Sequence, residues 1–173
     1  MKFTKEDARK RVLNCAKQYQ QNLLHKKLLI IFRERQDNSI RFIEVIFHER
    51  NYQHLTGLEL TNTEGKILQH QSKNFYRKCI ENKLGLNDVD KVMGGVNFCL
   101  GLSRENDVFI PSSALLEDIK KLTSSPSQVL AIFEKDIDSE LYSTVKHIAK
   151  GLNLHHLILP PEISSKISLE HYV

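Results

Sequence analysis

Two histidines, an arginine, a tyrosine and a threonine lie close together in the segment 47–58, and all of these side chains can bind a phosphate or transfer a proton. They are His48, Arg50, Tyr52, His54 and Thr56, with Gly57 directly after them. Histidine titrates near neutral pH and suits either proton transfer. Arginine stays charged and presents several donors in one plane. Because glycine lets the backbone approach a ligand closely, this segment is the first candidate for a site.

Cleavage of RNA without a metal ion needs these side-chain types. A base removes the proton of the 2′-hydroxyl, an acid protonates the departing 5′-oxygen, and donors stabilise the pentavalent phosphorane. Arg50 and His54 are four residues apart and Thr56 lies two beyond His54, so a curved segment can turn all three toward one phosphate. The alternative, which the residues leave open, is a strand-to-loop junction whose polar side chains satisfy backbone groups.

Other chemistry finds little support in the sequence. His48 and His54 have no third ligand at zinc-site spacing, and His155 and His156 are adjacent on an expected strand and so point to opposite faces. Gly94 and Gly95 lack the lysine and hydroxyl residue of a phosphate loop. The three cysteines are an odd number without a Cys-x-x-Cys pair. We therefore expect no bound metal and no cofactor.

Length and composition favour one globular domain. The chain has 173 residues, of which 40% are hydrophobic and 27% charged, enough for a single core. The assignment is therefore 1–173 as one domain, with the polar residues 161–173 compatible with a loose tail. No apolar run approaches the roughly 20 residues of a membrane span, and the N-terminus lacks a signal-peptide core. We expect a cytoplasmic protein without a membrane partner.

Charge is distributed unevenly along the chain. The formal net charge is +4, and residues 1–50 carry twice as many basic as acidic groups, whereas residues 101–173 carry more acidic ones. This asymmetry places a positive field beside the segment 47–58 and favours a polyanion there. A solvated basic helix face is an equally good explanation of the charge alone.

The elements that must position the site can be read on either side of it. Ala8, Val12, Ala16, Tyr19 and Leu23 recur at helical spacing and predict a helix from Thr4, its N-cap, to Leu24. The apolar runs 28–32 and 40–47, separated by the turn residues 37–39, predict a β-hairpin. The candidate segment leaves from the end of its second strand as a loop, so a rigid strand end would hold the site.

Later elements are less regular. We expect a helix over 73–84 with Ser72 as N-cap, a short helix over 87–92, and strands over 98–102 and 108–110. Ser112 or Ser113 is then expected to cap a helix reaching Leu122. Strands over 129–133, 141–149 and 154–159 complete the prediction. The strand 141–149 could bring Lys146 or His147 to the site from across the sheet.

One motif carries a resemblance to a known family. The run Arg50-Asn51-Tyr52-Gln53-His54-Leu55-Thr56-Gly57-Leu58, with Asn74-Phe75-Tyr76 and Pro111 to Ile119 as weaker matches, resembles the phage-associated barnase/EndoU/colicin/RelE-like nuclease domains. It is most similar to the group with an aromatic residue, a spacer and then His-Leu-Thr-Gly. The resemblance covers roughly residues 28–160, with the first helix as part of the same unit.

The resemblance implies an α+β fold, with an N-terminal helix and further helices on an antiparallel sheet, and RNase activity of the toxin or phage-effector type. By position it implies His54 and Thr56 as site residues, with Arg50 beside them and Tyr76 as a weaker match; Lys146 is added as a candidate phosphate ligand. RNA is then the expected substrate, and an antitoxin or immunity protein a candidate partner. A catalytically silent RNA- or protein-binding module and a phage accessory protein are the alternatives.

Overall fold

The computed structural model describes residues 4–56, 72–83, 99–115 and 118–168. Helices accompany a six-stranded, mostly antiparallel sheet with the strand order β3-β4-β2-β1-β5-β6, which confirms the expected α+β class. The residues group into two compact units that alternate along the chain. The first unit comprises Met1–Leu24, Phe47–Ser103 and Ile110–Asp118, and the second comprises His25–Ile46, Arg104–Phe109 and Ile119–Val173.

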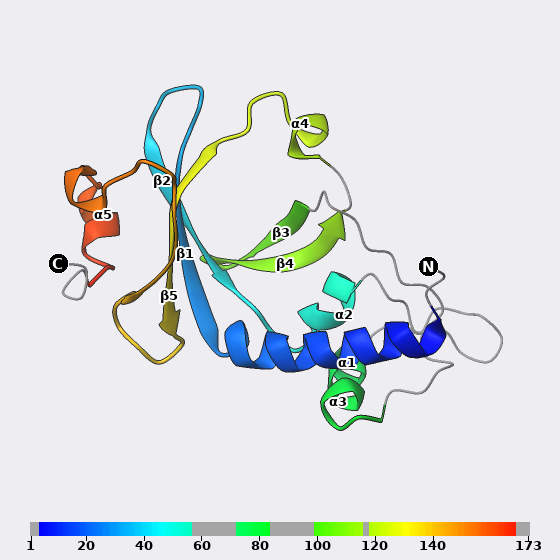
Figure 1. The fold of residues 1–173 in the computed structure, drawn as a ribbon. Helices are drawn as coiled ribbons and strands as arrows, with labels where there is room; N and C mark the ends of the chain where they lie inside the picture. Colours follow the sequence, from blue (N-terminus) through cyan, green and yellow to red (C-terminus); the bar gives the residue numbers. More distant parts are fainter. Residues whose placement is uncertain (1–3, 57–71, 84–98, 116–117, 169–173) are drawn as a thin grey trace. The chain divides into compact units, whose positions relative to one another are not determined.

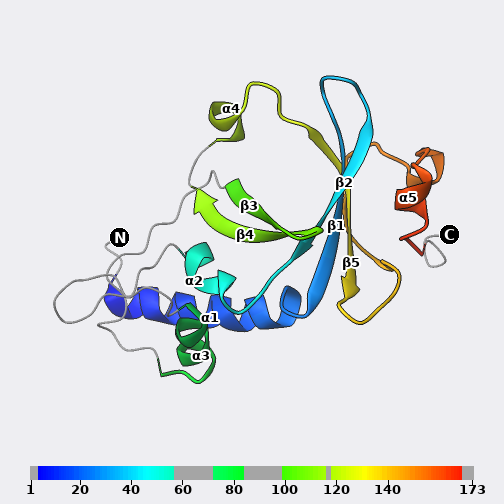
Figure 2. The same ribbon diagram turned by 180° about the vertical axis from the view of Figure 1, so that it is seen from behind.

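The first unit is built on helix α1 (Lys5–Asn22), which confirms the predicted N-terminal helix. Thr4 caps it as expected: its hydroxyl accepts the Asp7 N–H at 3.1 Å, while the Asp7 carboxylate accepts the Thr4 N–H at 3.1 Å. Val12, Ala16 and Tyr19 form its buried face. Helices α2 (Asn51–Thr56) and α3 (Ser72–Ile80) lie beside α1 (Figures 1 and 2).

Five aromatic side chains form the core between these helices. They are Tyr19, Phe47, Tyr52, Phe75 and Tyr76, with ring centroids 5.2 to 6.1 Å apart in tilted or edge-on pairs. Edge-on and tilted geometry suits the quadrupole of aromatic rings. The Tyr52 hydroxyl donates to the Val12 carbonyl at 2.5 Å, so α2 is held to α1 by a buried hydrogen bond as well as by packing.

The second unit contains the predicted hairpin of β1 (Lys26–Arg33) and β2 (Ile40–Ile46), with Leu29 opposite Glu44 in the register. Strand β5 (Gln128–Asp136) pairs antiparallel with β1, and β6 (Thr144–Ile148) pairs antiparallel with β5. The buried core of this unit consists of Leu29, Ile31, Leu130, Ala131, Phe133, Tyr142, Leu154 and Ile163. Strands β1, β2 and β5 are side by side in Figure 1.

Strands β3 (Cys99–Glu105) and β4 (Val108–Leu115) form the remaining neighbouring pair of the sheet. Asn106, between them, has a positive φ of 56°, which asparagine tolerates in tight turns. Strand β4 also meets β2 in parallel, where Val45 lies opposite Phe109.

Several predicted elements are wrong. The helix expected from Ser112 to Leu122 is wrong in its first part, because β4 continues to Leu115; among the described residues of this range, Ile119–Leu122 (α4) are helical. The strand expected over 154–159 is a short 3-10 helix, η2 (Leu154–His156), and the strand expected over 141–149 is limited to β6. The segment expected as a loop after β2 is helix α2. The short helix expected over 87–92 lies outside the described residues.

The polar C-terminal residues include an ordered turn of helix. Helix α5 (Pro161–Ser164) lies within the range that the sequence presents as compatible with a loose tail, and its Ile163 is fully buried in the core of the second unit. Tyr142 and Ile167 form an isolated parallel bridge, with the Tyr142 N–H donating to the Lys166 carbonyl at 2.8 Å.

Candidate active site

The candidate segment begins where β2 ends. Phe47 is buried and forms an isolated bridge with Leu24. Two hydrogen bonds then close the turn into α2: the Asn51 N–H donates to the His48 carbonyl at 2.9 Å, and the His48 N–H donates to Asn51 Oδ1 at 2.8 Å. Helix α2 buries Asn51, Tyr52 and Gln53 and exposes His54. The imidazole is therefore presented from a fixed helix.

Arg50 and His54 meet at one cleft. Arg50, just before α2, and His54, one helical turn later, are both exposed. They line a hollow of about 230 Å³ together with Asn51 and four residues of the β3–β4 pair: Ser103, Ile110, Pro111 and Ser112. Residues four apart share a helix face. Their spacing in the sequence therefore brings Arg50 and His54 to the same cleft.

Two hydroxyl groups and a buried amide at this cleft were not foreseen. Ser103 and Ser112 are exposed, and the Ser112 hydroxyl donates to the Gly101 carbonyl at 3.2 Å. The Asn51 amide donates to the buried Pro111 carbonyl at 2.8 Å. Sequence reasoning assigned Ser112 to a helix cap, because the local capping signal was followed. Residues 108–115 do not alternate between apolar and polar side chains, so no local pattern places Ser112 on a strand.

Thr56 lies at a different hollow. Its hydroxyl donates to the Gln53 carbonyl at 2.7 Å, three residues back. With Leu55 and Tyr52 it lines a hollow of about 580 Å³ on the α1 side of α2, a set of lining residues that does not include Arg50 or His54. The described geometry therefore gives Thr56 a bond within the helix and does not bring it to the cleft.

Tyr76 is buried within the aromatic core. Only 3% of the residue is exposed, and its ring lies 5.6 Å from that of Tyr52. Among the described residues its hydroxyl has no hydrogen-bond partner. Burial, followed by the charge of Glu49, raises the pKa of Tyr76. The position is that of a core side chain, and Tyr76 is not among the residues that line the cleft.

Lys146 belongs to the second unit. It lies on β6, where its Nζ is 3.1 Å from Glu134 Oε2. The Glu134 side chain is only 8% exposed and is also 3.5 Å from Lys26 Nζ. Because a nearly buried carboxylate needs compensating charge, Lys146 has a structural ion pair within its own unit.

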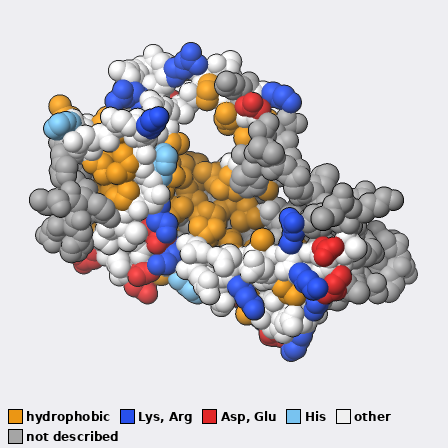
Figure 3. Space-filling model, in the orientation of Figure 1, with side chains coloured by type: hydrophobic (Ala, Val, Ile, Leu, Met, Phe, Trp, Pro, Cys, Tyr) orange, Lys and Arg blue, Asp and Glu red, His pale blue; other side chains and the backbone are white. Residues whose placement is uncertain are grey.

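Ion pairs engage three basic side chains of the β1–β2 hairpin. Lys26 lies 2.8 Å from Asp136 and Lys27 lies 3.3 Å from Glu44, while Arg41 pairs with Asp37 at 3.1 Å. On the face drawn in Figure 3, acidic side chains lie beside basic ones among the described residues. These three basic side chains are therefore paired with carboxylates inside the second unit, and the cleft lies in the first.

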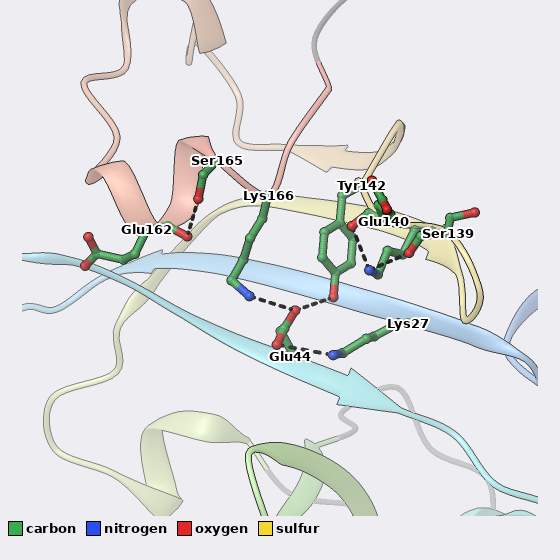
Figure 4. Close-up of polar contacts among 9 residues, drawn as sticks. Lys27, Glu44, Ser139, Glu140, Tyr142, Glu162, Ser165 and Lys166 are labelled. Carbon is green, nitrogen blue, oxygen red and sulfur yellow. Dashed lines mark hydrogen bonds and ion pairs between the residues drawn. The ribbon is translucent and has the colours of Figure 1, made fainter.

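Glu44 is the centre of a cluster of charged and polar side chains in the second unit (Figure 4). Tyr142 donates to Glu44 Oε1 at 2.7 Å, and the Nζ atoms of Lys27 and Lys166 lie 3.3 and 3.5 Å from its carboxylate oxygens. Burial acts to raise the pKa of Glu44, but the Tyr142 hydrogen bond and the two lysines outweigh it and lower the pKa. Glu44 on β2 is thus connected to Lys27 on β1, to Tyr142 between β5 and β6, and to Lys166 after α5.

Two kinds of feature are absent from the described residues, a metal-binding cluster and a membrane-spanning helix. No group of three or more His, Cys, Asp or Glu side chains there is arranged to hold a metal ion. No helix in the described ranges has the length and apolar character to cross a membrane.

Comparison with known proteins finds a similarity over slightly less than half of the chain, from within α1 to beyond α3. Residues 11–95 match the family described as phage-Barnase-EndoU-ColicinE5/D-RelE like nuclease4. The match confirms the predicted resemblance over residues 11–95, and the family description is that of a nuclease. The expected extent of 28–160, including the weaker match from Pro111 to Ile119, is not covered beyond residue 95. The match contains Arg50 and His54 and ends before β3. No curated protein and no solved structure matched the chain.

Proposed function

We propose that this relative of phage-associated nucleases is a metal-independent endoribonuclease that uses His54 and Arg50. The observation that carries the proposal is that these two side chains, exposed and one helical turn apart, line one cleft beside the hydroxyls of Ser103 and Ser112. The cleft of about 230 Å³ is smaller than the roughly 300–1,000 Å³ typical of small-molecule sites. That size suits one phosphodiester and its sugar.

In the proposed reaction the 2′-oxygen attacks phosphorus, the bond from phosphorus to the 5′-oxygen breaks, and a 2′,3′-cyclic phosphate and a 5′-hydroxyl result. His54 transfers a proton to or from the reacting oxygens, as an imidazole does well near neutral pH. The Arg50 guanidinium binds the equatorial oxygens, where the charge of the phosphorane develops. A second group carries the other proton transfer, and single substitutions of the residues that line the cleft identify it.

The other predicted residues have lesser roles in the proposal. Thr56 and Tyr76 support the helix and the core and transfer no proton in this scheme. Lys146 is retained as a candidate phosphate ligand, and Lys146→Ala with unchanged cleavage would remove it. A cytoplasmic RNA target and an antitoxin or immunity partner belong to the same proposal. Growth arrest on expression, relieved by His54→Ala, would support that toxin role.

The test is cleavage of a mixed RNA pool in EDTA by the full chain. We expect products ending in a 2′,3′-cyclic phosphate and no cleavage at a 2′-deoxy position. His54→Ala should lower the rate by about 10²–10⁴-fold, and Arg50→Ala by about 10²–10³-fold. Arg50→Lys, which keeps the charge but loses the fork of donors, should fall between wild type and Arg50→Ala.

Matched controls separate the site from general surface effects. His156 is exposed in the second unit, and Arg35 is exposed in the β1–β2 turn. His156→Ala and Arg35→Ala should cleave at the wild-type rate. Cleavage that survives in His54→Ala, or that requires a divalent ion, contradicts the proposal. Salt-sensitive RNA binding without any cleavage would instead support the silent binding module.

A further inference from the structure

We propose that Asn51 is a positioning residue that fixes the two walls of the cleft relative to each other within the first unit. This inference rests on the proposed function, because the residues that it positions are Arg50 and His54. Asn51 is the first residue of α2 and is only 4% exposed. It lies directly after Arg50 and one turn before His54, so its placement determines the placement of both.

The side chain of Asn51 uses both ends of its carboxamide. Its Oδ1 accepts the His48 N–H at 2.8 Å, which closes the turn from β2 into α2. Its Nδ2 donates to the Pro111 carbonyl at 2.8 Å, sixty residues away on β4. Pro111 is fully buried. One amide therefore joins the wall that carries Arg50 and His54 to the wall formed by Ile110, Pro111 and Ser112.

The same turn is also tied to α1. The His48 carbonyl accepts the Asn51 N–H at 2.9 Å and the Tyr19 hydroxyl at 2.8 Å. Tyr19 is 5% exposed. Both backbone polar groups of His48 are thus satisfied by these partners, two of them from Asn51. The start of α2 is consequently held from the α1 side and from the β4 side at once.

Only an amide of this length meets these two demands together. Asparagine offers one acceptor and an NH₂ donor on a short side chain, whereas aspartate in its ionised form accepts only and leucine does neither. Loss of the Nδ2 donor would leave the buried Pro111 carbonyl without this partner. A small displacement of reacting groups can cost about 100-fold in rate. In metalloenzymes the loss of a group that orients a metal ligand costs about 10–100-fold, which sets the scale expected for Asn51.

The experiment compares the full-length Asn51→Leu variant with wild type, with RNA as substrate and a 2′-deoxy oligonucleotide as the uncleaved probe of binding. We expect kcat to fall about 10–100-fold and KM and the probe Kd to rise together, because Arg50 no longer meets the phosphate. A smaller folded fraction lowers the apparent kcat alone, so the rise in KM separates positioning from stability. Should Asn51→Leu not fold, Asn51→Asp, assayed above pH 8, takes its place.

The matched control is Tyr142→Phe. It deletes a hydrogen bond from a buried side chain of the second unit and should leave kcat and KM unchanged. Wild-type kcat and KM in the folded Asn51 variant, or a fall in kcat with no change in KM, overturns the inference. Should the wild-type chain not cleave RNA, the proposed function fails. The positioning role is then tested by proton NMR, from the contacts between the neighbours of residue 51 and the neighbours of Pro111. If these contacts persist unchanged in the Asn51 variant, the positioning role is overturned.

Discussion

Replacing Tyr142 by phenylalanine isolates the hydrogen bond to Glu44. The change removes one hydroxyl from a fully buried side chain and leaves its ring in the core of the second unit. A hydrogen bond to a charged group contributes about 1.5–3 kcal/mol. Because Lys27 and Lys166 remain within 3.5 Å of the carboxylate, we expect a loss at the lower end, about 1.5–2 kcal/mol.

The loss should be visible in thermal unfolding. For a chain of this length, each kcal/mol corresponds to a change in Tm of about 2–4 °C, so Tm should fall by about 3–8 °C at pH 7. Glu44→Gln and the double variant complete a thermodynamic cycle. Its coupling energy should be at least about 0.5 kcal/mol, as for residues in direct contact.

The pH dependence follows from the lowered pKa of Glu44. Its value lies below the ordinary 4.5 in the folded chain, so the unfolded state binds the proton more readily. The stabilisation is fully present above about pH 4.5 and is lost as the pH falls through the lower folded-state pKa. The cost of Tyr142→Phe should therefore shrink between pH 5 and pH 3, since a neutral acceptor makes the weaker hydrogen bond.

An unchanged Tm in Tyr142→Phe would refute this reasoning, because the hydroxyl would then contribute nothing. A cost that stays the same down to pH 3 would refute the charge-assisted part of it. Tyr52→Phe is the matched control, since it also deletes a tyrosine hydroxyl, but one that donates to the neutral Val12 carbonyl.

Two further predictions concern stability. Tyr52→Phe should lower the free energy of unfolding by about 1 kcal/mol, by the same amount at pH 7 and at pH 3, measured by urea titration; a cost that varies with pH would contradict the assignment of a neutral acceptor. Ile163→Ala should cost about 2–5 kcal/mol, because the side chain is fully buried in the core of the second unit. A cost near zero in the same titration would mean that α5 does not pack there.

The elements predicted best are those whose signal is local and repeated. Helix α1 has several turns of apolar spacing and a capping box, and the β1–β2 hairpin has two apolar runs around an Asp-Asn-Ser turn. Arg50 and His54 lie on one surface because the segment is helical and residues four apart share a helix face. The sequence reasoning reached the same pair from a curved loop, in which a spacing of four does not fix the direction of side chains. Helix α2 itself, with six residues, is too short to show a period.

The elements predicted wrongly are those decided by distant partners. Ser112, with acidic and then basic residues after it, carries the local signature of a helix start, but β4 continues through it beside β3. Strand pairing of this kind overrides local preference. Leu154 was expected on a strand over 154–159, yet it lies in a 3-10 helix and is buried in the core. Neither the Pro111 carbonyl nor its donor, Asn51, carries any sequence signal of their contact.

The alternation of the two units along the chain limits how the protein can be shortened. Residues 11–95, which match the nuclease family, contain β1 without its neighbour β5 and Asn51 without Pro111. Excised alone, that stretch would carry a strand with a bare hydrogen-bonding edge, a template for aggregation. Gene trimming or grafting should therefore preserve the entire span from α1 to α5, since a homology boundary here is not a folding boundary.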